Sequence, residues 1–450
     1  MKYIRFLSRI LIGTVFIFSG FVKAVDPLGS AYKFADYFTA FKLDFLEFLS
    51  LPMGIILSAF EILLGLVLIL GYRRRIAFMV LLFFMSFFTL LTFFLALFNP
   101  VSDCGCFGDA LIITNWQTFF KNVILMVFVL ILYFSRKSEK DTGLPLREWM
   151  VVASLFVFAS LFSFWNYRHL PLLDFRPYDI GTVISEEMEV PDGVGMDEYS
   201  TTLIYRNRET GKTSSFTMED YPKDTLSWEF IDSESKLVKK GYEPPIHDFA
   251  LMDPSGRDLV EKILSDRGYS LLMISHELSG ANEQALINAE EWSQLQVFAG
   301  DFSFYAATSS TTVDVESISS ALNLDYPFLA GDEIMLKTIV RSNPGFMLVK
   351  NGVIIGKWGF RDFPLLEQVD SQLQELIGNA SVPMDEEAEL LFDAGITDEF
   401  SFNMVEFDHI FPKLLLNSTA ARHEQGVTII FILSVLSLLL LSGRISPLRV

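Results

Sequence analysis

The chain has 450 residues and a formal net charge of −20, and it contains 44 phenylalanines against 35 basic residues. Apolar runs lie in the first 166 residues and the last 25, whereas segment 167–425 holds 45 acidic against 19 basic residues. This acidity argues against nucleic-acid binding, which depends on Lys and Arg contacts to phosphate. The apolar runs indicate instead a membrane protein with a large acidic domain beside the bilayer.

Six segments are apolar and long enough to cross a bilayer, which takes about 20 residues. They are 6–24, 54–72, 76–98, 117–135, 149–166 and 427–443. The first follows Lys2, Arg5 and Arg9, as the apolar part of a signal peptide would. Lys23 and Asp26 come after it without a small-residue cleavage site. We therefore expect a retained helix.

Basic residues cluster at alternate ends of successive predicted spans. The clusters are Lys2/Arg5/Arg9, Arg73–Arg75, Arg136/Lys137/Lys140/Arg147 and Arg444/Arg449. Short cytoplasmic loops of membrane proteins are enriched in Lys and Arg. All four clusters can be cytoplasmic together only if the chain has six spans and both termini inside. Loops 25–53 and 99–116 and segment 167–425 would then lie outside.

Two charged residues of the predicted spans are candidates for function, because a charge is costly in hydrocarbon. Lys23 lies near the outer end of the first span and can reach the interface, so a structural role suits it equally well. Glu61 lies about seven residues into the second span and needs a partner, for which Lys23 and Ser19 are candidates. Proton handling and quinone contact are its candidate functions.

Segment 28–50 lies in the first outer loop and interleaves aromatic and Leu residues with charges. Such a pattern favours a helix in the outer interface of the membrane. The alternative is an ordinary ordered loop.

The loop between the third and fourth spans carries both cysteines of the chain, in the run Asp103-Cys104-Gly105-Cys106-Phe107-Gly108-Asp109. Outside the cytoplasm, thiols tend to form disulfides. A bridge between cysteines one residue apart closes a small, strained ring, and strained exposed disulfides belong to the labile or catalytic kind. Two interpretations stay open. The pair either exchanges electrons with a partner thiol or forms a passive turn.

The acidic segment contains two patterns. Thr202–Arg206 and Thr213–Thr217 flank a turn-rich stretch and predict a β-hairpin. Farther along, the order is strand, helix, strand, helix, hairpin and helix, expected at 271–275, 282–296, 303–307, 313–322, 345–350 with 353–358, and 364–377. This is the thioredoxin order, and Pro344 precedes the hairpin where such folds place a cis-proline.

The redox motif of thioredoxin-like enzymes is absent. These enzymes carry Cys-x-x-Cys where the first buried strand runs into its helix, and Ser279 and Asn282 stand in those two positions here. A serine hydroxyl titrates too high to attack a disulfide, so we expect no thiol exchange by this domain. We expect Ser279 to cap the helix and Asn282 to be a packing replacement. The groove beside Pro344 is expected to hold extended peptides by strand addition.

The cysteine loop resembles the MauE-like family, which has Cys-x-Cys-Phe-Gly in an outer loop of a four-helix unit. Ser19–Lys23 with Asp26-Pro27, and Glu61–Gly65 with Gly71, resemble the wider DoxX-like superfamily. Pro245–Leu251 resembles the first strand of TlpA-like thioredoxins. The resemblance implies a bacterial inner-membrane protein that handles disulfides with a thioredoxin-like partner of the MauD type. This chain looks like such a pair fused, as in DoxX-family proteins of Bacteroidetes, but without the partner's cysteines.

The predicted fold class is an α-helical membrane bundle, a four-helix DoxX/MauE-like unit plus two further spans, with an α/β thioredoxin-like domain in the periplasm. The predicted divisions are 1–136 for the four-helix unit, 149–166 for the fifth span, 167–243 for a β-rich linker, 244–380 for the thioredoxin-like domain, 381–425 for an acidic helical extension and 427–443 for the sixth span. The histidines are scattered without His/Cys spacing, so the sequence indicates no metal site.

The leading functional hypothesis is a membrane thiol–disulfide redox protein. In it, Cys104 and Cys106 exchange electrons with an envelope client or partner thiol, and the bundle passes electrons to a lipid-soluble acceptor, with quinone as the candidate cofactor. The alternative is a non-enzymatic adaptor that binds an envelope protein. A third hypothesis, from superfamily analogy alone, is an accessory subunit of a quinol-linked oxidase. The sequence leaves open whether any catalysis occurs.

Overall fold

The computed structural model describes residues 2–366 apart from 102, 139–144, 192, 196–197, 209, 240 and 299–301. The predicted acidic extension at 381–425 and the sixth span at 427–443 lie outside the described residues, as does nearly all of the helix expected at 364–377. The chain divides into two units, each of which makes most of its contacts within itself. The small unit is Thr182–Phe249, and the residues on both sides of it form the larger unit.

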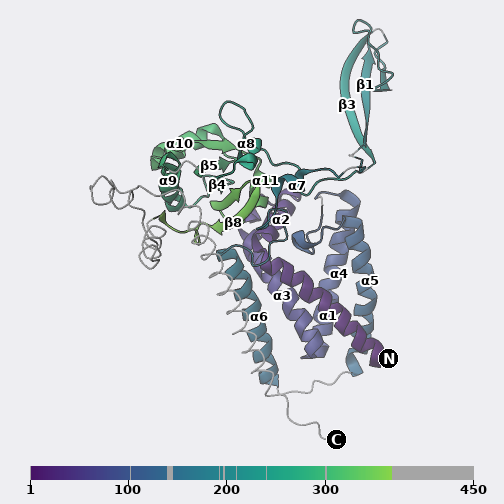
Figure 1. Ribbon diagram of the computed structural model, residues 1–450. Coiled ribbons are helices and arrows are strands. Elements are labelled where there is room, and N and C mark those ends of the chain that lie inside the picture. The colour runs from purple at the N-terminus through teal and green to yellow at the C-terminus, as the bar shows by residue number, and fades with distance from the viewer. Residues whose placement is uncertain are drawn as a thin grey trace, which may run out of the picture. The chain divides into compact units, whose positions relative to one another are not determined.

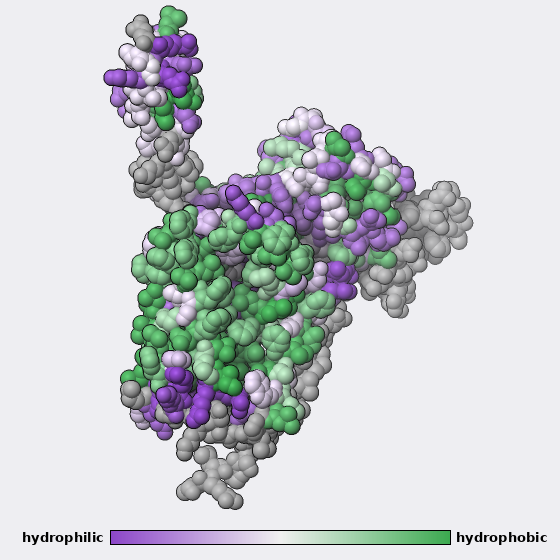
Figure 2. Space-filling model, turned by 180° about the vertical axis from the view of Figure 1, so that it is seen from behind, coloured by the Kyte–Doolittle hydropathy of each residue, from purple (hydrophilic) through white to green (hydrophobic). Residues whose placement is uncertain are grey.

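Among the described residues, five helices are long and apolar enough to cross a membrane. They are α1 (Lys2–Val25), α3 (Ser50–Leu70), α4 (Arg74–Phe98), α5 (Asn115–Ser135) and α6 (Pro145–Arg168). They correspond to the first five predicted spans. Large apolar side chains of these helices are exposed to the surroundings: Phe83, Phe98 and Phe134 are 78%, 73% and 74% exposed. Figure 2 shows one broad hydrophobic face of this bundle. A face of this kind suits lipid.

Helices α1 and α3 pack closely because glycines lie where they meet. A Cβ atom on Gly20 would lie 2.7 Å from the carbonyl oxygen of Ser58, and one on Gly65 would lie 2.6 Å from that of Gly13. Neither position has room for a side chain, and small residues of this kind let membrane helices approach each other closely. Because the helices approach closely, Lys23 of α1 and Glu61 of α3 can form an ion pair.

The segment predicted as an interfacial helix folds as α2 (Pro27–Ala40) followed by a short 3-10 helix, η1 (Asp44–Leu49). Asp26 caps α2, because its carboxylate accepts a hydrogen bond from the amide of Gly29 at 2.8 Å. Pro27 occupies the first helical position, where its missing N–H costs nothing. Since α2 packs against α3, its side chains can reach the loop that follows α4.

The C-terminal part of the larger unit contains a five-stranded sheet in the order β6-β5-β4-β7-β8 (Figure 1). Strands β4 (Tyr269–Ser275), β5 (Phe302–Thr308) and β6 (Phe328–Ala330) are parallel. Strands β7 (Gly345–Lys350) and β8 (Val353–Gly359) form an antiparallel hairpin, and β7 pairs antiparallel with β4. The helices of this part are α8 (Val260–Ser265), α9 (Glu283–Phe298), α10 (Thr312–Leu322) and α11 (Glu333–Ile339).

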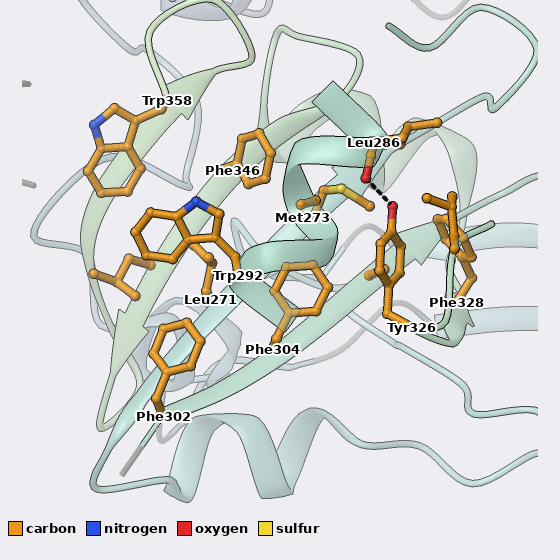
Figure 3. Packing of buried hydrophobic residues seen from close by; sticks show 14 of the residues in the cluster. Leu271, Met273, Leu286, Trp292, Phe302, Phe304, Tyr326, Phe328, Phe346 and Trp358 are labelled. Atoms are coloured by element: carbon orange, nitrogen blue, oxygen red, sulfur yellow. Dashed lines mark hydrogen bonds between the residues drawn. The ribbon is translucent and has the colours of Figure 1, made fainter. Parts of the chain in front are cut away.

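Large aromatic side chains fill the core beside this sheet (Figure 3). Trp292 of α9 and Trp358 of β8 are each only 1% exposed, and every residue of β4 is buried. The hydroxyl of Tyr326 donates a hydrogen bond to the carbonyl of Leu286 at 2.8 Å, which satisfies the buried phenol. The strands and helices expected from 271 to 358 are present, with ends shifted by at most two residues.

Three elements of this part were not predicted. The short helix α8 precedes β4, and the short strand β6 and the helix α11 lie between α10 and the hairpin. A three-residue strand is too short to show a period in its sequence.

The small unit holds a three-stranded antiparallel sheet in the order β2-β1-β3, together with the short helix α7 (Ile184–Met188). Its strands are β1 (Glu198–Asn207), β2 (Thr213–Thr217) and β3 (Trp228–Lys239). Thr202 pairs with Thr217 and Arg206 with Thr213, which confirms the predicted hairpin. Strand β3 was not predicted.

Candidate functional site

The loop between α4 and α5 folds its two cysteines onto each other. The Sγ atoms of Cys104 and Cys106 lie 3.1 Å apart, and both residues are free thiols in this structure. Gly105 between them has a φ of +64°, a conformation that glycine adopts without steric cost. Its amide also donates a hydrogen bond to Asp103 Oδ1 at 2.8 Å. The motif is therefore a tight turn that brings two sulfurs into contact.

Helices α1 and α2 hold this turn by hydrogen bonds. Ser19 Oγ donates to the carbonyl of Cys106 at 2.7 Å, and the Tyr37 hydroxyl donates to the carbonyl of Cys104 at 2.8 Å. Lys33 Nζ lies 2.7 Å from Asp103 Oδ2. Both cysteine carbonyls are thus anchored by residues remote in sequence, so the position of the thiols is set by the bundle as well as by the loop.

The two thiols differ in acidity. The hydrogen bond from Cys104 lowers the pKa of Cys106 to about 6, with further help from the positive charges of Lys121 and Lys23. The same hydrogen bond, together with burial, raises the pKa of Cys104. Lys121 of α5 lies close to the loop, with its Nζ 4.4 Å from the ring centre of Phe107. Near neutral pH the pair therefore shares one proton, and Cys106 is the thiolate.

The intramembrane residues singled out in the sequence form a buried ion pair. Lys23 Nζ lies 2.6 Å from Glu61 Oε2, and the two residues are 7% and 6% exposed. The same ammonium donates to Ser19 Oγ at 2.8 Å. Of the two partners considered for Glu61, the structure pairs it with Lys23, and Ser19 bonds to Lys23 rather than to Glu61. Because Ser19 also holds the Cys106 carbonyl, the ion pair and the cysteine turn belong to one connected polar network.

A cavity of about 470 Å³ lies beside this network. Its wall includes both cysteines, both members of the ion pair, and many apolar side chains of α1 to α5. Sequence reasoning missed the cavity, because its wall is assembled from five helices and no single segment carries a signal for it.

The degenerate redox positions of the α/β part lie next to the proline loop. The Asn343–Pro344 peptide bond is cis, and the amide of Asn282 donates to the carbonyl of Asn343 at 3.2 Å. The expected cap was wrong. Asn282 Oδ1 accepts from the Ala285 amide at 3.0 Å and caps α9, whereas the Ser279 hydroxyl donates to Glu277 Oε1 at 2.6 Å. Asn282 lies one residue before the helix, and Ser279 is too far from it in the chain.

Arg341 links the α/β part to the cysteine loop and was also missed. It is 7% exposed and lies 2.9 Å from Asp26 Oδ2 through Nε and 2.9 Å from Asp109 Oδ2 through Nη2. Asp26 caps α2, and Asp109 ends the cysteine motif. Nearby, the His276 ring centre lies 6.4 Å from that of Tyr32. Sequence reasoning missed Arg341 because a single arginine three residues before Pro344 forms no recognisable motif.

Fold and site together define a membrane helix bundle with a dithiol loop, joined to an α/β region. The family model described as "Methylamine utilisation protein MauE" matches residues 1–135, which hold the cysteine loop, the ion pair and the cavity wall. A domain of unknown function, DUF8463, matches residues 199–240 in the three-stranded sheet. The search of the curated proteins found no match.

One solved structure is described as "Solution structure of a putative protein disulfide isomerase from Bacteroides thetaiotaomicron". It shares 14% identity with this chain, covers 28% of this chain and 84% of its own, and has a TM-score of 0.23.

Proposed function

We propose that the chain is a membrane thiol–disulfide oxidoreductase in which the Cys104/Cys106 pair exchanges electrons with thiols of an envelope protein. The observation that carries this proposal is the contact of two free thiols at 3.1 Å on a turn anchored at both cysteine carbonyls. The lowered pKa of Cys106 supports it, because the thiolate is the reactive form of cysteine. The MauE match over the same residues is compatible with disulfide chemistry.

The exchange balances without a further reactant. When the pair is oxidised, a client thiolate attacks Cys104, the Cys104–Cys106 bond breaks, and Cys106 leaves as a thiolate. The second client thiol then attacks the mixed disulfide, which forms the client disulfide and releases Cys104. Two electrons and one proton pass from the client to the loop, which then holds Cys104 as a thiol and Cys106 as a thiolate. Cys106 is the better leaving group, since a thiol of lower pKa leaves faster.

We infer further that the α/β part is a thioredoxin-like domain that binds the client without reacting with it. Strands β5-β4-β7-β8 have the strand order and directions of a thioredoxin core, and a cis-proline precedes β7. Ser279 and Asn282 replace the cysteines, so the reactive sulfurs come from the membrane unit. The contact of Arg341 with Asp109 supports delivery of a client to the cysteine loop.

The proposal places the chain in a bacterial inner membrane as a relative of DoxX-like proteins, with both termini in the cytoplasm and the cysteine loop in the periplasm. The alternation of basic clusters supports this orientation.

Trapping of mixed disulfides tests the function. A Cys106→Ser variant cannot resolve a bond between Cys104 and a client, so it should accumulate a cross-link that reductant releases. The matched Cys104→Ser variant should trap less, and the double variant should trap nothing. Identical gel patterns from all three variants, each correctly inserted and folded, would show that the loop does not exchange disulfides.

A non-enzymatic adaptor is the second candidate function. The observation that favours it is an α/β part that keeps the cis-proline but has no cysteine. Two results together would support the adaptor. An envelope protein should co-purify with the chain even after all thiols are blocked, and cells with the double cysteine variant should grow and fold envelope proteins normally.

A further inference from the structure

Reduced Cys104 and Cys106 must lose two electrons before they can accept more from a client. The cavity of about 470 Å³ reaches both cysteines and lies among helices that suit a membrane. We propose that this cavity binds a lipid-soluble quinone, which reoxidises the pair. The redox step rests on the function proposed above, whereas the binding itself does not.

The size and wall of the cavity fit this ligand class. Small-molecule sites typically measure about 300–1,000 Å³ and have mostly apolar walls with a few polar groups. Most of the wall is apolar and rich in aromatic rings, among them Phe34, Phe38, Phe60, Phe84, Phe87 and Phe88. A quinone ring is flat and apolar on both faces, so it can stack against such side chains. A water-soluble electron carrier would find few partners there.

Cationic donors complete the match. Lys23 and Lys121 both line the cavity, and an ammonium donates hydrogen bonds but accepts none. The two oxygens of a quinone accept hydrogen bonds and gain negative charge on reduction. Cys106 lies in the same wall, so donors and electron source face one space. An acyl chain of a lipid would use the apolar wall but not the cationic or thiol groups.

The reaction balances as a two-electron transfer. The Cys104 S–H bond breaks, and the Cys106 thiolate and Cys104 form the S–S bond. The quinone takes up the two electrons, the proton of Cys104 and a second proton from the Lys23 ammonium at the cavity wall, and becomes a quinol. The Lys23 ammonium lies at the cavity wall with its Nζ 2.6 Å from Glu61 Oε2. It is placed to act as a proton donor beside the ligand, and Glu61 holds it there.

A matched pair of substitutions on α4 tests the site. Leu91 lines the cavity, whereas its neighbour Leu90 is 58% exposed on the outer face. In the purified full chain in lipid nanodiscs, Leu91→Trp should weaken binding of decylubiquinone or menadione by about tenfold or more. Leu90→Trp should leave the affinity within about twofold of wild type. Thermal unfolding of both variants controls for folding.

Two further measurements separate the ligand site from the proposed function. A Cys104→Ser/Cys106→Ser variant should bind quinone normally but form no quinol, and wild-type protein labelled by a photoreactive azidoquinone should carry the label on cavity peptides. The quinone site is excluded if the wild-type protein binds neither quinone. It is also excluded if both Trp variants bind quinone equally well and the photolabel lies on peptides outside the cavity. Either result holds even if mixed disulfides are trapped. If quinone binds but no mixed disulfide forms, the proposed function fails and the binding site stands.

Discussion

At the scale of single residues, two cysteines of one short motif acquire different chemical roles. Their carbonyls are held by Ser19 and Tyr37 at similar distances, so backbone position does not distinguish them. The distinction comes from the hydrogen bond between the thiols, which lowers the pKa of Cys106 and raises that of Cys104, whereas the charge of Lys121 lowers the pKa of both. Exchange chemistry needs such an asymmetry, because one sulfur must be attacked while the other leaves.

The pH dependence of alkylation tests this asymmetry. In reduced protein, the rate of Cys106 modification by iodoacetamide should rise through a midpoint of about 6, since the thiolate forms as the pH passes the pKa. Cys104→Ala and Lys121→Met each remove a cause of the lowered pKa and should move the midpoint upward. Lys137→Met, an exposed lysine beyond the far end of α5, is the control. Midpoints equal to wild type in the first two variants would contradict the assignment.

The Lys23–Glu61 pair permits a second prediction. Glu61→Gln leaves a buried ammonium without its carboxylate and should destabilise the protein by about 3 kcal/mol, because an unpaired buried charge is costly. The double variant Lys23→Met/Glu61→Gln removes both charges and should recover most of that loss. Thermal unfolding in nanodiscs measures both. A double variant less stable than the single one would mean that the pair is not energetically coupled.

At the scale of elements, the cysteine loop depends on helices from both parts of the larger unit. The glycine contacts of α1 with α3 allow the ion pair, and α2 supplies Tyr37 and Lys33. From the α/β side, Arg341 reaches Asp109 at the end of the cysteine motif.

A histidine lies near this contact. Burial lowers the pKa of His276, which follows β4, and the charge of Lys337 acts in the same direction, so that this pKa is about 4. His276 is therefore neutral beside Tyr32 near pH 7.

Removal of the Arg341 charge tests this connection. Arg341→Gln leaves Asp26 and Asp109 without their shared counter-charge, so the α/β part should hold the loop less tightly. We expect alkylation of the cysteines in native protein to become several-fold faster, and hydrogen exchange around 103–109 to increase. Arg257→Gln is the matched control, since Arg257 is 78% exposed in its pair with Asp253. Equal rates in both variants would rule out a role for Arg341 in holding the loop.

At the scale of the whole molecule, orientation in the membrane decides the redox environment of the loop. In the proposed orientation, the basic clusters at the start of α1, at the start of α4 and after α5 lie on the cytoplasmic side, following the positive-inside rule. The cysteine loop joins α4 to α5 at their opposite ends and falls on the other side. A reducing compartment would keep both thiols reduced.

Labelling of intact cells tests the orientation. After mild reduction, a membrane-impermeant maleimide should modify Cys104 or Cys106 without permeabilisation. A Lys137→Cys variant in a Cys104→Ser/Cys106→Ser background should react only after the membrane is opened. The reverse pattern would invert the topology and remove the oxidising environment.

Local patterns were sufficient for much of the fold. The five described spans are long apolar runs, the hairpin at Asn351-Gly352 has a strong turn signal, and the cysteine motif is visible as a string of letters. Each depends on residues close in the chain. The cap of α9 at Asn282 and strand β3 were missed, since competing polar residues and an irregular pattern obscured them.

The sequence by itself therefore determined the membrane helices, the main strands of the α/β part and the dithiol motif, because periodicity and turn chemistry act over a few residues. Only the tertiary structure decided which groups meet. It joined Glu61 to Lys23, Lys23 to Ser19 and Ser19 to the Cys106 carbonyl, and it enclosed a cavity among five helices. The Lys23–Glu61 and Ser19–Cys106 contacts join residues 38 and 87 positions apart in the chain, and the energies of these contacts come from burial and packing that no local pattern encodes.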